Sequence, residues 1–113
     1  MIDVLFEDNH IIIINKEAGE LVQGDSTGDK TLVDKVKLYL KKKYKKPGEV
    51  FLGLVHRIDR PTSGIVICAK TSKALTRLNE QFKKRNVEKK YLAIVKNPFT
   101  IESRTLTNWI AKN

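Results

Sequence analysis

Residues 51–69 read FLGLVHRIDRPTSGIVICA, with an apolar run on either side of a polar centre. The two runs, Phe51 to Val55 and Ile65 to Ala69, are short and rich in aliphatic side chains, which is typical of buried strands. The segment between them, residues 56–64, contains a proline and a glycine, and both residue types favour turns. The stretch therefore predicts two strands joined by a charged turn.

A helix is predicted on each side of this stretch. Upstream, Thr31 followed three residues later by Asp34 is a capping pattern for a helix that ends near Pro47-Gly48. Downstream, Thr71 or Ser72 can cap a second helix. Apolar side chains recur with helical spacing in both segments, and we expect them to face a core: Leu32, Val36, Tyr39 and Leu40 with Tyr44 on the same side, and Leu75, Leu78 and Phe82.

The remaining segments complete an α+β (mixed α/β) pattern. Val4 to Phe6 and His10 to Asn15 predict a hairpin, and the polar, glycine-containing residues 16–30 predict a loop. Val87 to Val95 has strand character up to a break at Pro98, and the apolar residues that follow predict one more short helix. Strands and helices alternate without a strict βαβ repeat, which favours a mixed sheet. The last predicted helix carries Leu106, Trp109 and Ile110.

The composition indicates a soluble domain with an anionic partner. Twenty-two Lys and Arg against thirteen Asp and Glu give a formal charge of +9, and nucleic acid is the first candidate for a partner of such charge. The longest aliphatic run, Ile11 to Ile14, is too short to cross a bilayer, and no signal peptide is recognised. A single cysteine, Cys68, excludes an intrachain disulfide. We therefore expect a cytoplasmic protein that does not bind membranes.

The chemical groups are densest in residues 56–64. Asp59 lies between Arg57 and Arg60, and nearby positive charge favours the ionised form of a carboxylate. An ionised carboxylate can act as a nucleophile or a base, and arginines commonly contact phosphates. The residues alone leave a second interpretation open, in which this segment is a surface ion-pair cluster on an ordinary turn.

Three segments resemble those of the RluA-type RNA pseudouridine synthases. Residues 56–64, HRIDRPTSG, are similar to the family's HRLDRxTSG motif, with Ile58 in place of leucine. Residues 15–19, NKEAG, resemble its NKPxG segment, with Glu17 in place of proline, and residues 89–95, KKYLAIV, resemble its KxYxAxV strand. The later basic segment of the family and the S4 RNA-binding domain of some relatives are not found. Residues 1–113 are thus expected to be the N-terminal portion of a catalytic domain.

The resemblance implies a fold, an activity and roles for individual residues. The implied fold is a mixed, largely antiparallel sheet with flanking helices, present as a partial domain. Asp59 would be the catalytic aspartate that attacks or deprotonates the target uridine, Tyr91 would pack on its base and assist proton removal, and Arg57 would enter the RNA stack. Such a reaction needs no cofactor, since uridine and pseudouridine are isomers. Structural support for the turn is expected from His56, Thr62, Ser63 and Gly64.

Lysine and arginine clusters are candidates for RNA contacts. One cluster, residues 41–46, lies at the end of the first predicted helix, and the other, residues 83–85 with 89–90, follows the second. Phosphate binding is one interpretation of each cluster, and a favourable interaction with the helix dipole is the other. The predicted RNA-binding residues are Arg60, Lys16, Lys42, Lys43, Lys84, Arg85, Lys89 and Lys90. No metal site is predicted, because His10, His56 and Cys68 lack metal-ligand spacing.

The leading functional hypothesis is an enzyme that converts uridine to pseudouridine in ribosomal or transfer RNA. The rival hypothesis is an RNA-binding module without catalysis, or an inactive fragment that keeps the basic surface. A DNA-binding domain is supported only by the charge, without a helix-turn-helix or zinc-finger pattern. If the chain ends at Asn113, self-association could cover the apolar surface around Trp109.

Overall fold

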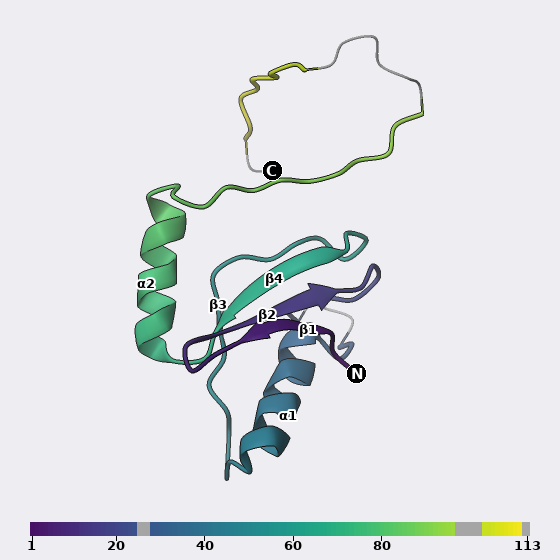
Figure 1. The fold of residues 1–113 in the computed structure, drawn as a ribbon. Coiled ribbons are helices and arrows are strands. Elements are labelled where there is room, and N and C mark those ends of the chain that lie inside the picture. The colour runs from purple at the N-terminus through teal and green to yellow at the C-terminus, as the bar shows by residue number, and fades with distance from the viewer. Residues whose placement is uncertain (25–27, 97–102, 112–113) are drawn as a thin grey trace.

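The computed structural model describes residues 1–24, 28–96 and 103–111. Within these residues the chain forms one four-stranded sheet and two α-helices (Figure 1). The four strands are arranged in the order β1-β2-β4-β3, and every neighbouring pair is antiparallel. This arrangement confirms the α+β expectation. The elements are β1 (Val4–Glu7), β2 (Ile11–Lys16), α1 (Leu32–Tyr44), β3 (Gly53–Leu54), β4 (Gly64–Ala69) and α2 (Ser72–Lys83).

The two central strands, β2 and β4, pair along their full length. The register runs from Ile11 opposite Ala69 to Lys16 opposite Gly64. At the edge, β3 pairs with β4 only through Gly53 and Leu54, so the predicted strand is shorter than its apolar run. Beyond Leu54 the chain leaves the ladder and enters residues 56–63. The polar segment therefore joins two neighbouring antiparallel strands, as predicted.

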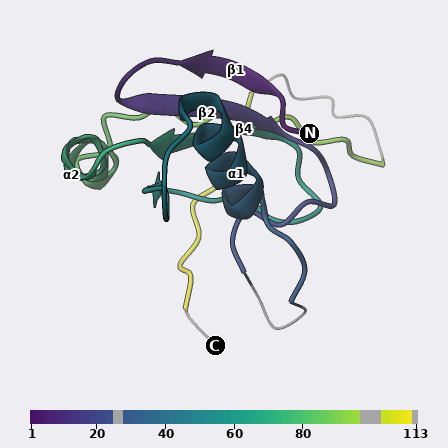
Figure 2. The same cartoon turned by 90° about the horizontal axis from the view of Figure 1, so that it is seen from below.

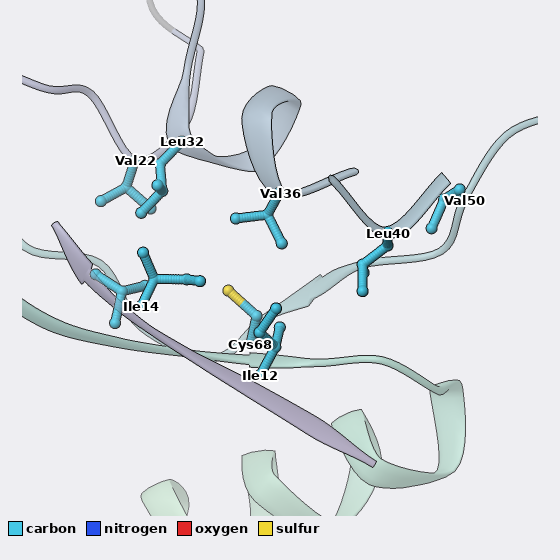
Figure 3. Packing of buried hydrophobic residues seen from close by; sticks show 9 residues of the cluster. Ile12, Ile14, Val22, Leu32, Val36, Leu40, Val50 and Cys68 are labelled. Carbon is cyan, nitrogen blue, oxygen red and sulfur yellow. The ribbon is translucent and has the colours of Figure 1, made fainter. Parts of the chain in front are cut away.

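One face of the sheet is covered by α1 (Figure 2). Alternate residues of β2 and β4 point to this face, and the exposed fraction of Ile12, Ile14 and Val66 is 0%. They pack with the apolar stripe of α1 and with Cys68, whose thiol pKa is raised to about 11 by burial (Figure 3). Each fully buried aliphatic side chain contributes about 1.5–3 kcal/mol relative to an exposed one. The stripe consists of Leu32, Val36 and Leu40.

Both predicted helix caps are present. The Thr31 side chain accepts a hydrogen bond from the Asp34 N–H, and the Asp34 carboxylate accepts one from the Thr31 N–H, which forms a complete capping box. Thr71 caps α2 by accepting the N–H of Ala74. At its other end, α1 stops at Tyr44, before the predicted Pro47-Gly48 boundary.

Two predicted elements are absent from the described residues. Residues 87–95 form no strand, because β-structure requires a paired neighbour and this segment has none within the described chain. Residues 103–111 form no helix, and Trp109 is fully exposed; a short amphipathic helix depends on a surface to pack against. Pro98, the predicted end of the strand, lies outside the described residues. None of the described helices has the length and apolarity needed to span a membrane.

The two tyrosines of α1 differ from the expectation that both are core residues. Tyr39 packs partly buried against the core, whereas Tyr44 is 46% exposed. Both phenol groups donate hydrogen bonds to the carboxylate of Glu7 at the end of β1. A phenol keeps a polar partner when the rest of its ring is apolar, which explains why these tyrosines sit at the margin of the core.

Candidate active site

The Asp59 carboxylate is presented to solvent on a turn between β3 and β4. The turn is closed by the Thr62 N–H, which donates to the Asp59 carbonyl oxygen at 2.9 Å. Gly64 follows with φ +140°, a backbone conformation that favours glycine, and it pairs with Lys16 where β4 begins. Among the described residues none donates a hydrogen bond to the carboxylate, which is exposed and free to meet a ligand.

A buried lysine, Lys16, connects this turn to the loop that follows β2. Lys16, at the end of β2, is 1% exposed, and its Nζ donates to the carbonyl oxygens of Glu17 at 2.9 Å, Glu20 at 2.7 Å and Arg60 at 3.1 Å. These bonds use all three ammonium hydrogens. Burial lowers the pKa of Lys16. This placement contradicts the predicted RNA contact of Lys16, because the ammonium group is enclosed by backbone. Its role is to bind loop 17–20 to the residue that follows Asp59.

Replacing Lys16 with methionine is expected to destabilise the fold by about 3 kcal/mol, because carbonyl acceptors lose their charged donor. Urea unfolding of the variant and the parent measures the difference. Lys35→Met is the matched control: Lys35 on α1 pairs with the Glu20 side chain of the same loop, its side chain is 34% exposed, and such a partly exposed ion pair contributes about 1 kcal/mol. An equal loss of stability in the two variants would contradict the role of Lys16 in binding the loop to the turn.

Arg60 ties the turn to the same loop from the solvent side. Its Nε donates to the Gly19 carbonyl oxygen at 2.9 Å, while the Gly19 N–H donates back to the Arg60 carbonyl oxygen at 2.7 Å. The guanidinium also forms an ion pair with Asp29 at 2.9 Å. These side-chain contacts of Arg60 are therefore to loop residues and not to the Asp59 carboxylate. Arg57, which precedes Asp59 by two residues, is exposed.

His56 anchors the start of the turn to β4 and α2. Its Nε2 accepts the N–H of Ile67 at 3.0 Å, and its ring stacks on Phe82 with centroids 5.2 Å apart. Only a neutral imidazole can accept through Nε2. Burial lowers the pKa of His56, and the charge of Lys89 lowers it further, so both effects favour that form. This geometry supports the orienting role expected of His56.

A groove lies between the outer face of β4 and the extended segment 87–92. Its volume is about 680 Å³, within the range of roughly 300–1,000 Å³ found for small-molecule sites. Ile65 and Ile67 line it on the sheet side, and Tyr91 lines it on the opposite side. Thr62, Ser63 and Gly64 of the turn are also part of the lining. Tyr91 is 65% exposed and thus presents an aromatic face beside the turn.

Besides Lys16 and Arg60, the six other predicted RNA-binding cations fall into two regions. Lys84, Arg85, Lys89 and Lys90 follow α2, and of these Lys89 and Lys90 line the groove. Lys84 pairs with Glu80, Lys90 pairs with Glu88, and the Nζ of Lys89 lies 5.5 Å from the ring centroid of Phe82. The other two, Lys42 and Lys43, lie at the C-terminal end of α1. The structure therefore brings Lys89 and Lys90 to the groove beside the turn that carries Asp59, whereas Lys42 and Lys43 lie at the end of α1.

Sequence reasoning missed Gly19, Glu20 and Asp29 as partners of the turn. All three belong to the 16–30 loop. Gly19 and Asp29 contact Arg60 across 41 and 31 residues, whereas Glu20 accepts from Lys16, which in turn reaches Arg60 across 44 residues. The one usable signal was Lys16 itself, a lysine directly after four consecutive isoleucines and an asparagine. Within the described residues no group of three or more His, Cys, Asp and Glu side chains could hold a metal ion.

Comparison with known proteins assigns the chain to a family. Residues 10–112 match the family model for RNA pseudouridylate synthase, so the chain belongs to the RNA pseudouridylate synthase family. Ribosomal large subunit pseudouridine synthase C from Buchnera aphidicola subsp. Schizaphis graminum is 37% identical over 110 residues, which are 97% of this chain and 33% of the relative. The enzyme of the same name from Escherichia coli strain K12 is 34% identical over 110 residues, again 97% of this chain and 33% of the relative.

The fold agrees with this assignment. The solved structure of Human RNA Pseudouridylate Synthase Domain Containing 4 is similar with a TM-score of 0.62 and 26% sequence identity, covering 74% of this chain and 30% of that chain. The present chain spans about a third of the length of the curated relatives it matches. The family and the antiparallel α+β fold expected from the resemblance are thereby confirmed.

Proposed function

We propose that this chain takes part in the isomerisation of uridine to pseudouridine in structured RNA, with Asp59 as the catalytic carboxylate. Ribosomal RNA is the first candidate substrate, because the curated relatives are named for the large ribosomal subunit, and transfer RNA is the second. The observation that carries the proposal is the exposed Asp59 carboxylate on a turn held by Lys16 and Arg60, inside the residues that match the family.

The reaction moves a glycosidic bond from nitrogen to carbon. The bond between N1 of the base and C1′ of the ribose breaks, the base rotates, and a bond between C5 and C1′ forms. N1 gains a proton, and the proton on C5 leaves to solvent, so product and substrate have the same atoms. Asp59 either attacks the sugar or removes a proton from it. No redox or group-transfer cofactor enters this balance.

The target nucleotide must leave the RNA stack before its base can rotate, which costs a few kcal/mol. Arg57 is exposed next to the turn, and a planar guanidinium can stack in the vacated space. Tyr91 lines the groove beside the turn and supplies an aromatic face for the extruded base. Lys89 and Lys90 line the same groove, and together with Lys84 and Arg85 they are assigned to phosphate contacts in this proposal.

Two further parts of the proposal concern the domain and the location. We infer that residues 1–113 correspond to the N-terminal portion of a catalytic domain, which is supported by the share of each relative that is matched. A cytoplasmic location is part of the proposal, since the relatives are named as pseudouridine synthases of the ribosomal large subunit.

Tritium release tests the proposed activity. RNA carrying tritium at uridine C5 is incubated with the full chain, and nucleosides are then analysed for pseudouridine. Release into water together with the appearance of pseudouridine is expected, because C5 loses its hydrogen only when it becomes the attachment carbon. RNA binding without release, on total ribosomal and transfer RNA, would contradict catalysis and leave a binding module.

A further inference from the structure

A second basic surface lies at the end of the sheet away from Asp59. It consists of Lys41, Lys42, Lys45 and Lys46, at and just beyond the C-terminal end of α1, and is called the α1-end surface below. Each of these four lysines is exposed, and none forms an ion pair within the described residues. A cluster of unpaired positive charges attracts polyanions such as nucleic acids.

The α1 end is fixed on the sheet by a buried carboxylate. Glu7, at the end of β1, accepts hydrogen bonds from Lys43 at 2.8 Å, Lys70 at 2.6 Å, Tyr44 at 2.6 Å and Tyr39 at 3.1 Å. Its side chain is 7% exposed. Burial alone would raise the pKa of Glu7, but these four bonds outweigh it and lower the pKa to about 2. The helix end is therefore anchored, and the neighbouring lysines are presented from a fixed position.

The lysines extend past the part of the helix that the dipole can explain. Cations in the last turn of a helix are stabilised by its dipole, but Lys45 and Lys46 follow the final residue, Tyr44. Lys45 also adopts the left-handed conformation, with φ 51°, where glycine is preferred and other residues carry a steric cost. Helix stability alone would favour glycine at this position. A lysine there adds charge to the surface at the expense of stability.

Aromatic side chains and a hollow accompany the charge. The Tyr44 ring centroid lies 4.8 Å from the Nζ of Lys70 and 5.9 Å from that of Lys46. A hollow of about 170 Å³ beside it is lined by Tyr44, Lys46, Phe51 and Lys70 among others. Tyr44 and Phe51 are 46% and 45% exposed. Basic side chains interleaved with exposed aromatic rings are typical of nucleic-acid surfaces.

The position relative to Asp59 sets the kind of contact. Gly64 at the start of β4 lies next to the catalytic turn, and Lys70 directly follows its end, so the two places are separated by the length of this strand. Six residues at about 3.3 Å each span about 20 Å. An RNA whose target uridine reaches Asp59 would meet the α1-end surface only through nucleotides that flank the target.

We propose that the α1-end surface binds the phosphate backbone of the substrate RNA about 20 Å from the target nucleotide. The proposal rests on the proposed function, since it takes the substrate to be RNA. It assigns Lys41, Lys42, Lys45 and Lys46 to affinity and placement, and it gives them no part in the chemical step. Lys43 and Lys70 hold the surface in place through Glu7.

The test removes two of these charges and compares a matched pair elsewhere. Lys42→Gln with Lys46→Gln is made in the full chain, and Lys73→Gln with Arg77→Gln on the exposed face of α2 removes the same charge. Binding is measured by fluorescence anisotropy with RNA hairpins whose stems extend for different lengths beyond a loop uridine. Lys45 is left unchanged because its φ is strained.

On long stems, affinity of the Lys42/Lys46 variant at 0.1 M salt should fall by about 8-fold for one lost phosphate contact and about 60-fold for two. The slope of log K against log salt should decrease by about 0.9 per contact. Stems too short to reach 20 Å should show no difference, and the control pair should match the parent. In tritium release, KM should rise while kcat at saturating RNA stays unchanged.

Several results would overturn the proposal. An equal loss of RNA affinity in the control pair would show that only the net charge of the protein matters. A loss of affinity that does not depend on stem length would show that these lysines do not contact RNA about 20 Å from the target. Unchanged RNA affinity with lysine-dependent binding to phosphatidylserine vesicles would assign the surface to a membrane. Tight, lysine-dependent RNA binding without tritium release would leave this surface standing and remove the synthase function, whereas a parent that binds no RNA would remove both.

Discussion

Asp59→Asn is expected to reduce tritium release from uridine-labelled RNA by at least about 1,000-fold, with little change in RNA affinity. Asparagine has nearly the same shape as aspartate but cannot act as a nucleophile or a base. The carboxylate holds no other part of the structure, since among the described residues none donates a hydrogen bond to it. The free energy of unfolding should therefore change by less than about 0.5 kcal/mol.

The control for this variant is Glu49→Gln, which removes an equal charge from an exposed site away from the turn. Its tritium release at saturating RNA should match that of the parent. Retention of more than about a tenth of the activity in Asp59→Asn would remove Asp59 from the chemical step. Loss of activity accompanied by an equal loss of RNA affinity would instead indicate a binding role, because a catalytic group acts mainly on kcat.

The local parts of this fold could be predicted from the sequence because their signals are local. Thr31 and Asp34 lie three residues apart and form the predicted capping box, and Thr71 caps the second helix as expected. The apolar runs on either side of residues 56–64 became antiparallel neighbours because the turn between them brings the chain back. Patterns with a period of two or 3.6 residues are sufficient for such elements.

The segment 87–95 shows where that reasoning fails. Its residues have strand propensity, but propensity measures how a side chain fits a paired, half-buried surface, and the described chain offers no partner strand here. The predicted helix around Trp109 fails for a related reason, because no described surface covers its apolar side. Local pattern identifies what a segment can form, while its neighbours determine what it does form.

The sequence pointed to the candidate residues of the site, but it did not reveal the contacts that hold them in place. The 56–64 motif marked Asp59 and His56, whereas the contacts that hold the turn come from the 16–30 loop. Lys16 illustrates the difficulty: a lysine read from sequence is assigned to the surface, and only the structure shows its three carbonyl partners. Contacts between residues tens of positions apart leave no periodic trace in the sequence.

Glu7 is a second long-range centre that the sequence did not reveal, and its replacement should have a large, pH-dependent effect. Glu7→Gln is expected to lower the free energy of unfolding by about 3 kcal/mol at pH 7. The carboxylate pKa is about 2 in the folded chain against 4.5 for an unperturbed glutamate. A depressed folded-state pKa means that the ionised group stabilises the fold above pH 4.5, and that this contribution is lost as the pH falls towards 2.

Urea unfolding of the parent and Glu7→Gln between pH 7 and pH 2 measures this contribution as the difference between the two. The difference should be constant down to about pH 5 and shrink below it. Glu80→Gln is the matched control, since its exposed pair with Lys84 contributes only about 0.3–0.5 kcal/mol. A pH-independent difference would show that Glu7 acts through packing and not through its charge.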